Sequence, residues 1–343
     1  MSIWKYIGRR ALEYLITWYV AVSLAFILPH LLPIDPVKLM IQRLISTASS
    51  SGGGGIVVTS QAMQELAHRL EVMFGVDKPL YMQYLLFIWN ALHLNFGVSI
   101  WLLGTPVSQI ILRVLPYDII LLVPAVILSW YVGNKLGAYL GFDKRGTKTD
   151  KASLPALYAL NNAPYFWFAL LLMMIFASYL HIFPPTGTPY SQLPSLTWSY
   201  VSDLLWHMAL PFLSLFAVSL GGWAIGMRQN MLNEVRSNYA VYGEALGLTK
   251  GVLRRYTYHN AILPQITGLA INLGYIVAGN AVLEFTFQYP GIGMILGNAI
   301  YNYDYFLMQG IFFFVVTMVL IANFIIEVVY TVIDPRIRAS VSA

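Results

Sequence analysis

The chain is 343 residues long, with 58% hydrophobic and 10% charged residues, where a soluble domain has about 25% charged residues. A soluble protein of this size could not bury so much apolar surface, so the composition indicates an integral membrane protein. The chain has no cysteine, which excludes disulfides, thiol catalysis and cysteine-bound metals.

The first apolar run, at residues 14–32, is long enough to cross a membrane, since a span takes about 20 apolar residues. Its length and the lack of a small-residue cleavage site favour a retained anchor over a signal peptide. The long stretch after it, residues 37–116, does not repeat this pattern. It holds a Ser/Gly-rich tract at 46–55, an expected amphipathic helix at 61–74, and an apolar helix at 79–95 that is short for a span.

Five further apolar runs bring the predicted number of spans to six, which places both termini on one side of the membrane. These runs are at residues 119–140, 156–180, 204–227, 265–283 and 305–326. The short loops on the opposite side, 182–202 and 285–303, contain no Lys or Arg. The short segments on the side of the termini hold Lys144, Arg145, Lys148, Lys151, Arg228, Arg236, Lys250, Arg254, Arg255, Arg336 and Arg338. By the positive-inside rule, both termini are predicted to be cytoplasmic.

Residues 238–264 form the longest polar interval in the C-terminal half and read as helix, break, helix. Asn238 is expected to cap the first helix, and Gly247 to end it in the left-handed conformation. Thr249 can cap the second helix, which Leu263-Pro264 closes. Two short helices between spans suit docking of a partner outside the membrane. The basic residues of the second helix equally suit a helix that lies on lipid headgroups, and spacing alone leaves both interpretations open.

The order Glu244-Ala245, Gly247 and then Leu263-Pro264 resembles the "EAA loop" of ABC importer permeases, in particular those of the dipeptide/oligopeptide branch. Further matching stretches are Leu32 to Pro36, Phe74 to Pro79, Asn95 to Gly97, Pro106-Val107, Val282 to Glu284, Tyr289 to Gly293, Tyr303 to Gly310 and Asp334 to Arg338. The resemblance covers nearly the whole chain. Leu246 departs from it, since a second small residue is usual there.

The resemblance implies an all-α integral membrane protein with the type I ABC importer permease fold, six transmembrane helices and both ends inside. It implies a first transmembrane helix within residues 1–36, an extracytoplasmic region at 37–116, and a permease core at 117–343 with a cytoplasmic coupling loop at 228–264. The residues expected to couple to an ATPase are Tyr239, Tyr242, Gly243, Glu244, Ala245, Leu246, Gly247 and Leu248.

The resemblance also implies partners in the cell membrane of a prokaryote. These are a second related permease, two ATP-binding subunits, an extracytoplasmic substrate-binding protein and the lipid bilayer, with no nucleic acid. The chain lacks a G-x-x-x-x-G-K-[ST] stretch. We therefore expect it to bind no cofactor and to catalyse nothing, with ATP and Mg²⁺ held by the ATPase subunits.

Ionisable and polar residues in or near the spans are the other candidates for function. Glu284 is expected to face either a substrate vestibule or another polar loop. Asn323 and Glu327 share a helix face, where a contact between helices is favoured over a substrate role. His207 and His259 near span ends suit solvated histidines better than a proton relay. We find no metal-ligand spacing and no catalytic Ser/His/Asp arrangement.

The favoured function is half of the translocation pathway of an ATP-driven importer of di- or oligopeptides. The alternatives are the same role for oligosaccharides or another solute, or an ATP-independent secondary transporter. A secondary transporter is expected to carry charges at mid-membrane, and the predicted spans are nearly free of them.

Overall fold

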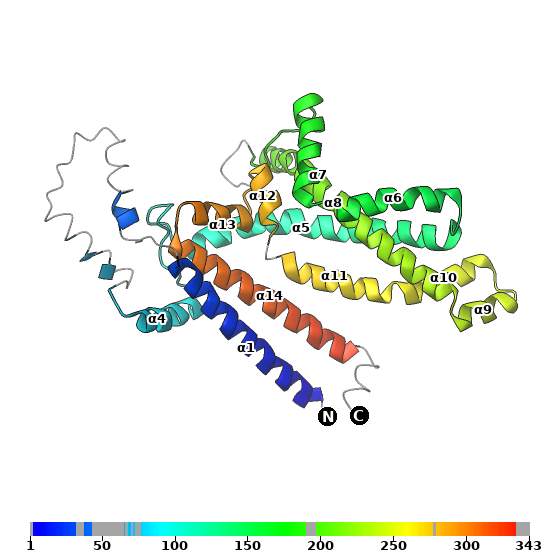
Figure 1. The fold of residues 1–343 in the computed structure, drawn as a ribbon, viewed down its shortest axis with the longest axis horizontal. Coiled ribbons are helices and arrows are strands. Elements are labelled where there is room, and N and C mark those ends of the chain that lie inside the picture. The colour runs from blue at the N-terminus through cyan, green and yellow to red at the C-terminus, as the bar shows by residue number, and fades with distance from the viewer. Residues whose placement is uncertain are drawn as a thin grey trace. The chain divides into compact units, whose positions relative to one another are not determined.

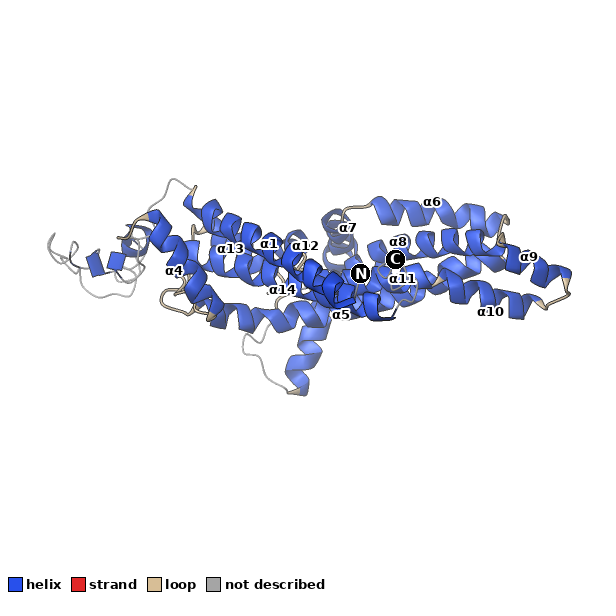
Figure 2. Ribbon diagram, turned by 90° about the horizontal axis from the view of Figure 1, so that it is seen from below, coloured by secondary structure: helices blue, strands red, loops and turns tan. Residues whose placement is uncertain are grey.

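A computed structural model describes residues 3–31, 38–42, 65, 68–69, 71–72, 77–189, 197–276 and 279–333, and the regular elements within them are helices (Figures 1 and 2). The Ser/Gly-rich tract at 46–55, most of the helix expected at 61–74, and the Asp334 to Arg338 stretch lie outside the described residues. The chain divides into two compact units. Unit 1 contains Met1–Leu115 and Ile295–Ala343, and unit 2 contains Pro116–Met294.

In unit 1, the first and last long helices pack along each other. Helix α1 is Ile3–His30 and helix α14 is Tyr305–Ile333. Trp18 Nε1 donates to Thr317 Oγ1 at 2.9 Å, and the rings of Tyr14 and Phe324 meet edge to face with centroids 5.4 Å apart. Aromatic rings with matched polar groups therefore hold the two apolar helices together.

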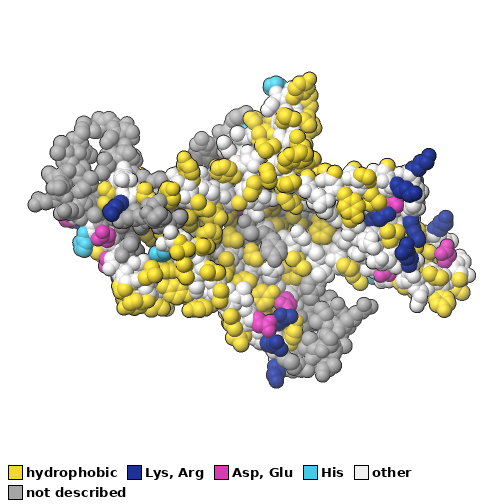
Figure 3. Space-filling view, viewed as in Figure 1, with side chains coloured by type: hydrophobic (Ala, Val, Ile, Leu, Met, Phe, Trp, Pro, Cys, Tyr) yellow, Lys and Arg dark blue, Asp and Glu magenta, His cyan; other side chains and the backbone are white. Residues whose placement is uncertain are grey.

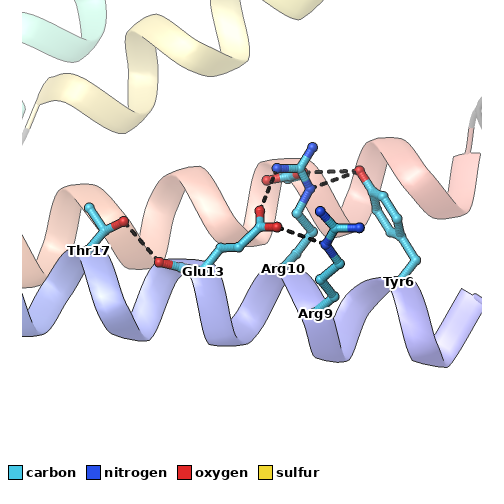
Figure 4. A network of polar contacts seen from close by, with 6 residues as sticks. Tyr6, Arg9, Arg10, Glu13 and Thr17 are labelled. Carbon is cyan, nitrogen blue, oxygen red and sulfur yellow. Dashed lines mark hydrogen bonds and ion pairs between the residues drawn. The ribbon is translucent and has the colours of Figure 1, made fainter.

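A polar network ties the start of α1 to the end of α14 (Figure 4). Arg10 Nε lies 2.7 Å from Glu327 Oε1, and the Tyr6 hydroxyl donates to the same oxygen at 3.2 Å. Arg10 also pairs with Glu13 at 2.8 Å. Glu327 therefore makes a contact between helices, as expected.

Helix α4, Leu80–Leu92, is too short to span and packs on α1. The hydroxyls of Ser23 and Tyr84 lie 2.7 Å apart, and the rings of Phe26 and Phe87 have centroids separated by 5.4 Å. The apolar segment predicted at 79–95 therefore forms a helix that packs on α1.

Unit 2 begins at Pro116, within α5, and contains a series of helices along the chain. They are α5 (Val107–Ala138), the π-helix η1 (Tyr139–Asp143), α6 (Lys148–Asn162), α7 (Tyr165–Leu172), the π-helix η2 (Met173–Tyr179), α8 (Trp198–Val235), α9 (Asn238–Ala245), α10 (Lys250–Ala261), α11 (Leu263–Tyr275) and α12 (Ala281–Phe287). Helix α13, Ile292–Tyr301, begins in unit 2.

Glycines let the backbone of α8 approach its neighbours closely in unit 2. A Cβ at Gly133 would lie 2.6 Å from the Cβ of Trp223, and one at Gly137 would meet the carbonyl oxygen of Ala224. A Cβ at Gly221 of α8 would lie 2.7 Å from the carbonyl oxygen of Leu157 in α6. Such close approach is the usual way in which helices associate in membranes.

Two predicted spans are not continuous helices. The span expected at 156–180 bends by 105° between α6 and α7, because Pro164 lacks an amide donor and forces Ala163 into an extended conformation (ψ 128°). The span expected at 265–283 breaks between α11 and α12, where Gly279 has φ +69° and Asn280 caps α12.

Four described helices are long and apolar enough to cross a membrane, and the bent pair raises the number to five by length and composition. They are Lys5–His30, Val107–Asp143, Trp198–Val235 and Tyr305–Val328. The second begins twelve residues before the run predicted at 119–140, so α5 starts inside the region predicted as a long loop.

Candidate functional site

Helices α9 and α10 form a compact knob at one end of unit 2, beyond the end of α8 (Figure 1). The break between them closes as the sequence predicts. Gly247 has φ +77°, its amide donates to the Glu244 carbonyl at 3.0 Å, and the Leu248 amide donates to the Gly243 carbonyl at 3.0 Å. These two bonds are the Schellman motif, which satisfies the last carbonyls of α9.

The side chain of Leu248 folds back over α9 at this turn. A Cβ at Gly243 would lie 2.9 Å from Leu248 Cδ1, so Gly243 is small because Leu248 covers it. Leu253 and Ala240 are also buried, where α9 and α10 pack together and onto α8. The knob therefore has a fixed shape.

The N-cap of α9 differs by one residue from the predicted N-cap. Ser237, with an extended backbone, is the N-cap of α9, and Asn238 is already helical. The Ser237 hydroxyl donates to the Glu234 carbonyl at 2.6 Å, which fixes it at the end of α8. Thr249 is the N-cap of α10, as predicted.

The outer surface of the knob is apolar and exposed. The side chain of Tyr242 is 71% exposed and that of Leu246 is 84% exposed, and the exposed Glu244 lies between them in sequence. Tyr239 is held more firmly, since its hydroxyl donates to Glu234 Oε2 at 2.5 Å. Burial raises the pKa of Tyr239, and this hydrogen bond raises it further. A fixed apolar surface with one carboxylate suits a protein partner.

Basic side chains gather over the same end of unit 2 (Figure 3). Two of the acidic residues among them, Asp150 and Asp143, form ion pairs within the chain. Asp150 is 2% exposed and forms two bonds with Arg228, at 2.7 and 2.8 Å, and Asp143 pairs with Arg254 at 3.2 Å. The remaining positive charge, including that of the exposed Lys148, faces outward, as on the cytoplasmic side of a membrane protein.

The other predicted site residues are outside α9 and α10. Leu263 and Pro264 begin α11, with Pro264 in its first turn, where a missing amide donor costs nothing. Asn323 is half-buried on α14. Glu284 is fully buried and accepts three backbone hydrogen bonds, so it faces a polar turn of its own chain and not a vestibule.

Three buried carboxylates, Asp118, Asp150 and Asp304, were not identified from the sequence. Asp150 stood unnoticed in a basic loop, and Asp118 stood just before a predicted span. The sequence offers a signal for each of these two: Asp150 is a carboxylate among basic residues, and Asp118 is a lone acid beside an apolar run. Within the described residues, no group of three His, Cys, Asp or Glu side chains could hold a metal ion.

Comparison with known proteins gives one consistent result. Residues 133–339 match the family described as "Binding-protein-dependent transport system inner membrane component". The Oligopeptide transport system permease protein AppB of Bacillus subtilis is 28% identical, and the alignment covers 97% of this chain and 99% of that protein. The Dipeptide transport system permease protein DppB of Escherichia coli K12 is 28% identical, with 96% and 97% covered.

The Di/tripeptide transport system permease protein DppB of Pseudomonas aeruginosa is 30% identical, over 97% of this chain and 98% of that protein. The similarity therefore extends from end to end of the relatives as well as of this chain, and it includes the knob. This chain belongs to the family of binding-protein-dependent transport system inner membrane components, and it is a permease subunit.

Proposed function

We propose that this permease subunit forms half of a pathway for di- or oligopeptides, and that ATPase subunits drive it by docking on α9. The peptide cargo is supported by the names of three relatives that match nearly the full length of the chain. The docking role is supported by the fixed, exposed apolar surface around Tyr242 and Leu246, beyond the end of the long helix α8.

The proposed assembly has four kinds of component besides lipid. A second related permease completes the pathway, two ATP-binding subunits hold ATP and Mg²⁺, and an extracytoplasmic binding protein delivers the cargo. This chain then contributes no catalytic group. Closure of the ATPase dimer pushes α9, and the direct joining of α10 to α11 through Ile262 carries the push into the membrane.

We further propose six spans with both termini inside. Four long helices qualify singly, and the bent pair of α6 with α7 and η2 supplies another. Helices α11 and α12, taken together across their break, supply the last. The region at 37–116 then lies mainly outside, residues 1–36 carry the first span, and 117–343 form the core, with the coupling loop at 228–264 in the cytoplasm. Asn323 is the remaining candidate for the substrate path.

Co-purification tests the docking role. Leu246→Glu places a charge on the apolar surface without disturbing the fold, since Leu246 is 84% exposed. We expect the variant to insert normally and to lose the co-expressed ATPase subunits. Tyr301→Glu, at an equally exposed residue on the predicted outer side, is the matched control and should retain them. Retention of the ATPase subunits by both variants would refute docking on α9.

Uptake tests the cargo separately. Cells that carry the permease should accumulate radiolabelled trialanine, and cells that lack it should not. If the labelled oligosaccharide maltotriose is taken up instead, the peptide assignment is wrong while the docking role stands.

A further inference from the structure

Two buried carboxylates of unit 2 meet at a turn that the proposed function does not use. Asp118 is in the first turn of the unit 2 part of α5, and Glu284 is in α12. Both are 0% exposed. A Cβ at Gly291 would touch both Asp118 Oδ1 and Glu284 Oε2. The two oxygens therefore face the same point, where only glycine fits.

Both carboxylates also hold the beginning of α13. Glu284 Oε2 accepts the amides of Gly293 at 2.7 Å and Met294 at 3.1 Å, and Asp118 Oδ2 accepts the amide of Ile292 at 2.9 Å. These are the first amides of the helix, which have no partner within it and carry its positive partial charge. The helix start therefore binds one negative charge well.

The hydrogen bonds do not support two negative charges. Glu284 Oε1 also accepts the amide of Asn280 at 2.6 Å, so both oxygens of Glu284 are engaged as acceptors. Asp118 Oδ1 has no backbone donor, and in the described part of the chain neither carboxylate forms an ion pair. Two facing carboxylates without a cation cannot both be ionised at low cost. A proton on Asp118 Oδ1 removes the repulsion and gives that oxygen a partner in Glu284.

The titratable groups that face the pair supply no positive charge. They are Tyr117 of α5, Tyr289 of the turn and Tyr200 of α8. The Tyr289 hydroxyl donates to the Tyr117 carbonyl at 2.8 Å, and the hydroxyls of Tyr117 and Tyr200 lie 2.5 Å apart. Asp203 of α8, near Tyr200, lies 3.1 Å from the ring nitrogen Nδ1 of His207. Tyrosines are neutral near pH 7, so the pair has to balance its own charge.

The pair sits near both places where the chain leaves unit 2. One is after Leu115 in α5, three residues before Asp118, and the other is after Met294 in α13, whose amide Glu284 accepts. We propose that Asp118 and Glu284 share one proton, held on Asp118, and act as positioning residues that fasten α5 to the start of α13 at both exits from unit 2. The two segments then move together during transport.

Infrared spectroscopy of the full chain in lipid nanodiscs near pH 7 tests the proton directly. The difference spectrum between wild type and Asp118→Asn should show the loss of one protonated carboxyl band, which shifts in D₂O. Loss of a carboxylate band instead would place the charge on Asp118 and overturn the proposal. Asn keeps an N–H donor where the proton lies, so a failure of Asp118→Asn to fold would overturn it as well.

Thermal unfolding at a series of pH values gives a second readout. The melting temperature of the wild type should fall as the pH rises above about 4, because the Asp118 carboxyl then ionises in the unfolded chain but keeps its proton in the folded chain. The melting temperature of Asp118→Asn should lack this fall, because the amide does not titrate. Glu284→Gln should be less stable than Asp118→Asn, since its amide would face backbone donors. Parallel pH curves for wild type and Asp118→Asn, or a more stable Glu284→Gln, would overturn the assignment.

Discussion

Gly247→Val is the sharpest test of the turn that shapes the knob. Gly247 has φ +77°, and a Cβ there meets no atom within 4 Å. The cost of a side chain is therefore backbone strain and not a clash. For residues other than glycine, the left-handed conformation costs about 1–2 kcal/mol, with the larger value for a β-branched residue. A loss of about 2 kcal/mol lowers the population of the native turn by a factor of about 30.

A series of substitutions separates strain from other effects. Gly247→Asn should be nearly neutral, because Asn tolerates the left-handed conformation. Gly247→Pro should be the most harmful, since it fixes a negative φ and removes the amide that donates to the Glu244 carbonyl. Gly251→Ala is the matched control. A Cβ there also meets nothing, but the residue lies within α10, where alanine stabilises by about 1 kcal/mol.

The assay compares the amount of permease in the membrane with the amount of co-purified ATPase subunit. Membrane insertion should be equal in all variants, and ATPase retention should fall in the order Asn, Val, Pro. The reasoning is refuted if Gly247→Val and Gly247→Pro retain the ATPase subunits and support uptake at the level of Gly251→Ala.

Three further predictions concern buried contacts. Asp150→Ala should lower the free energy of unfolding by about 3–5 kcal/mol, because it leaves Arg228 without its buried partner, and Arg228→Met in the same chain should recover part of the loss. Denaturant unfolding in detergent measures the stability of both variants. Equal stability of the single and the double variant would contradict this prediction. Gly137→Val should lower the free energy of unfolding by about 1–3 kcal/mol or more, because the added side chain forces α5 away from the backbone of α8. The measurement is the melting temperature, which should fall. An unchanged melting temperature would show that the two helices separate freely. Asp304→Asn should cost about 1–3 kcal/mol in unfolding experiments, because both carboxylate oxygens are acceptors and an amide nitrogen cannot accept. Asp304 Oδ2 accepts the Ser99 hydroxyl at 2.5 Å and the Trp101 amide at 2.9 Å, and Oδ1 accepts the Leu307 amide at 3.1 Å. An unchanged stability would mean that the second acceptor oxygen contributes nothing.

Local signals in the sequence were enough to predict the knob. A glycine followed two residues later by Thr249 predicts a left-handed stop and a new cap, and the structure has both. The cap of α9 was wrong by one residue because Ser237 and Asn238 are equally suited to it. The hydrogen bond from Ser237 to Glu234 at the end of α8 decides between them, and it depends on three-dimensional geometry.

The breaks in two predicted spans cannot be predicted from the length of their apolar runs. Pro164 and the Gly279-Asn280 pair are visible in the sequence, but each stands within an apolar run long enough to cross a membrane. Proline and glycine are tolerated inside membrane helices, so neither residue alone predicts a break. Whether a helix continues depends on which neighbours satisfy the freed backbone groups.

The buried pairs could not be predicted, because their members are far apart in the chain. Asp150 and Arg228 are separated by 78 residues. Asp118 and Glu284 are still further apart, and the contact between them depends on Gly291. Sequence reasoning identified Glu284 as notable but left its surroundings open. Only the fold shows that it holds the start of a helix.

The most direct measurement is the accessibility of a cysteine on the surface of α9. The chain has no cysteine of its own, so Leu246→Cys, at an 84% exposed position, provides a single thiol for a membrane-impermeant maleimide. We predict labelling in inside-out vesicles but not in right-side-out vesicles, and protection from labelling when the ATPase subunits are bound. Labelling from the outer side, or equal labelling with and without the ATPase subunits, would contradict the assignment of α9 as the cytoplasmic docking helix.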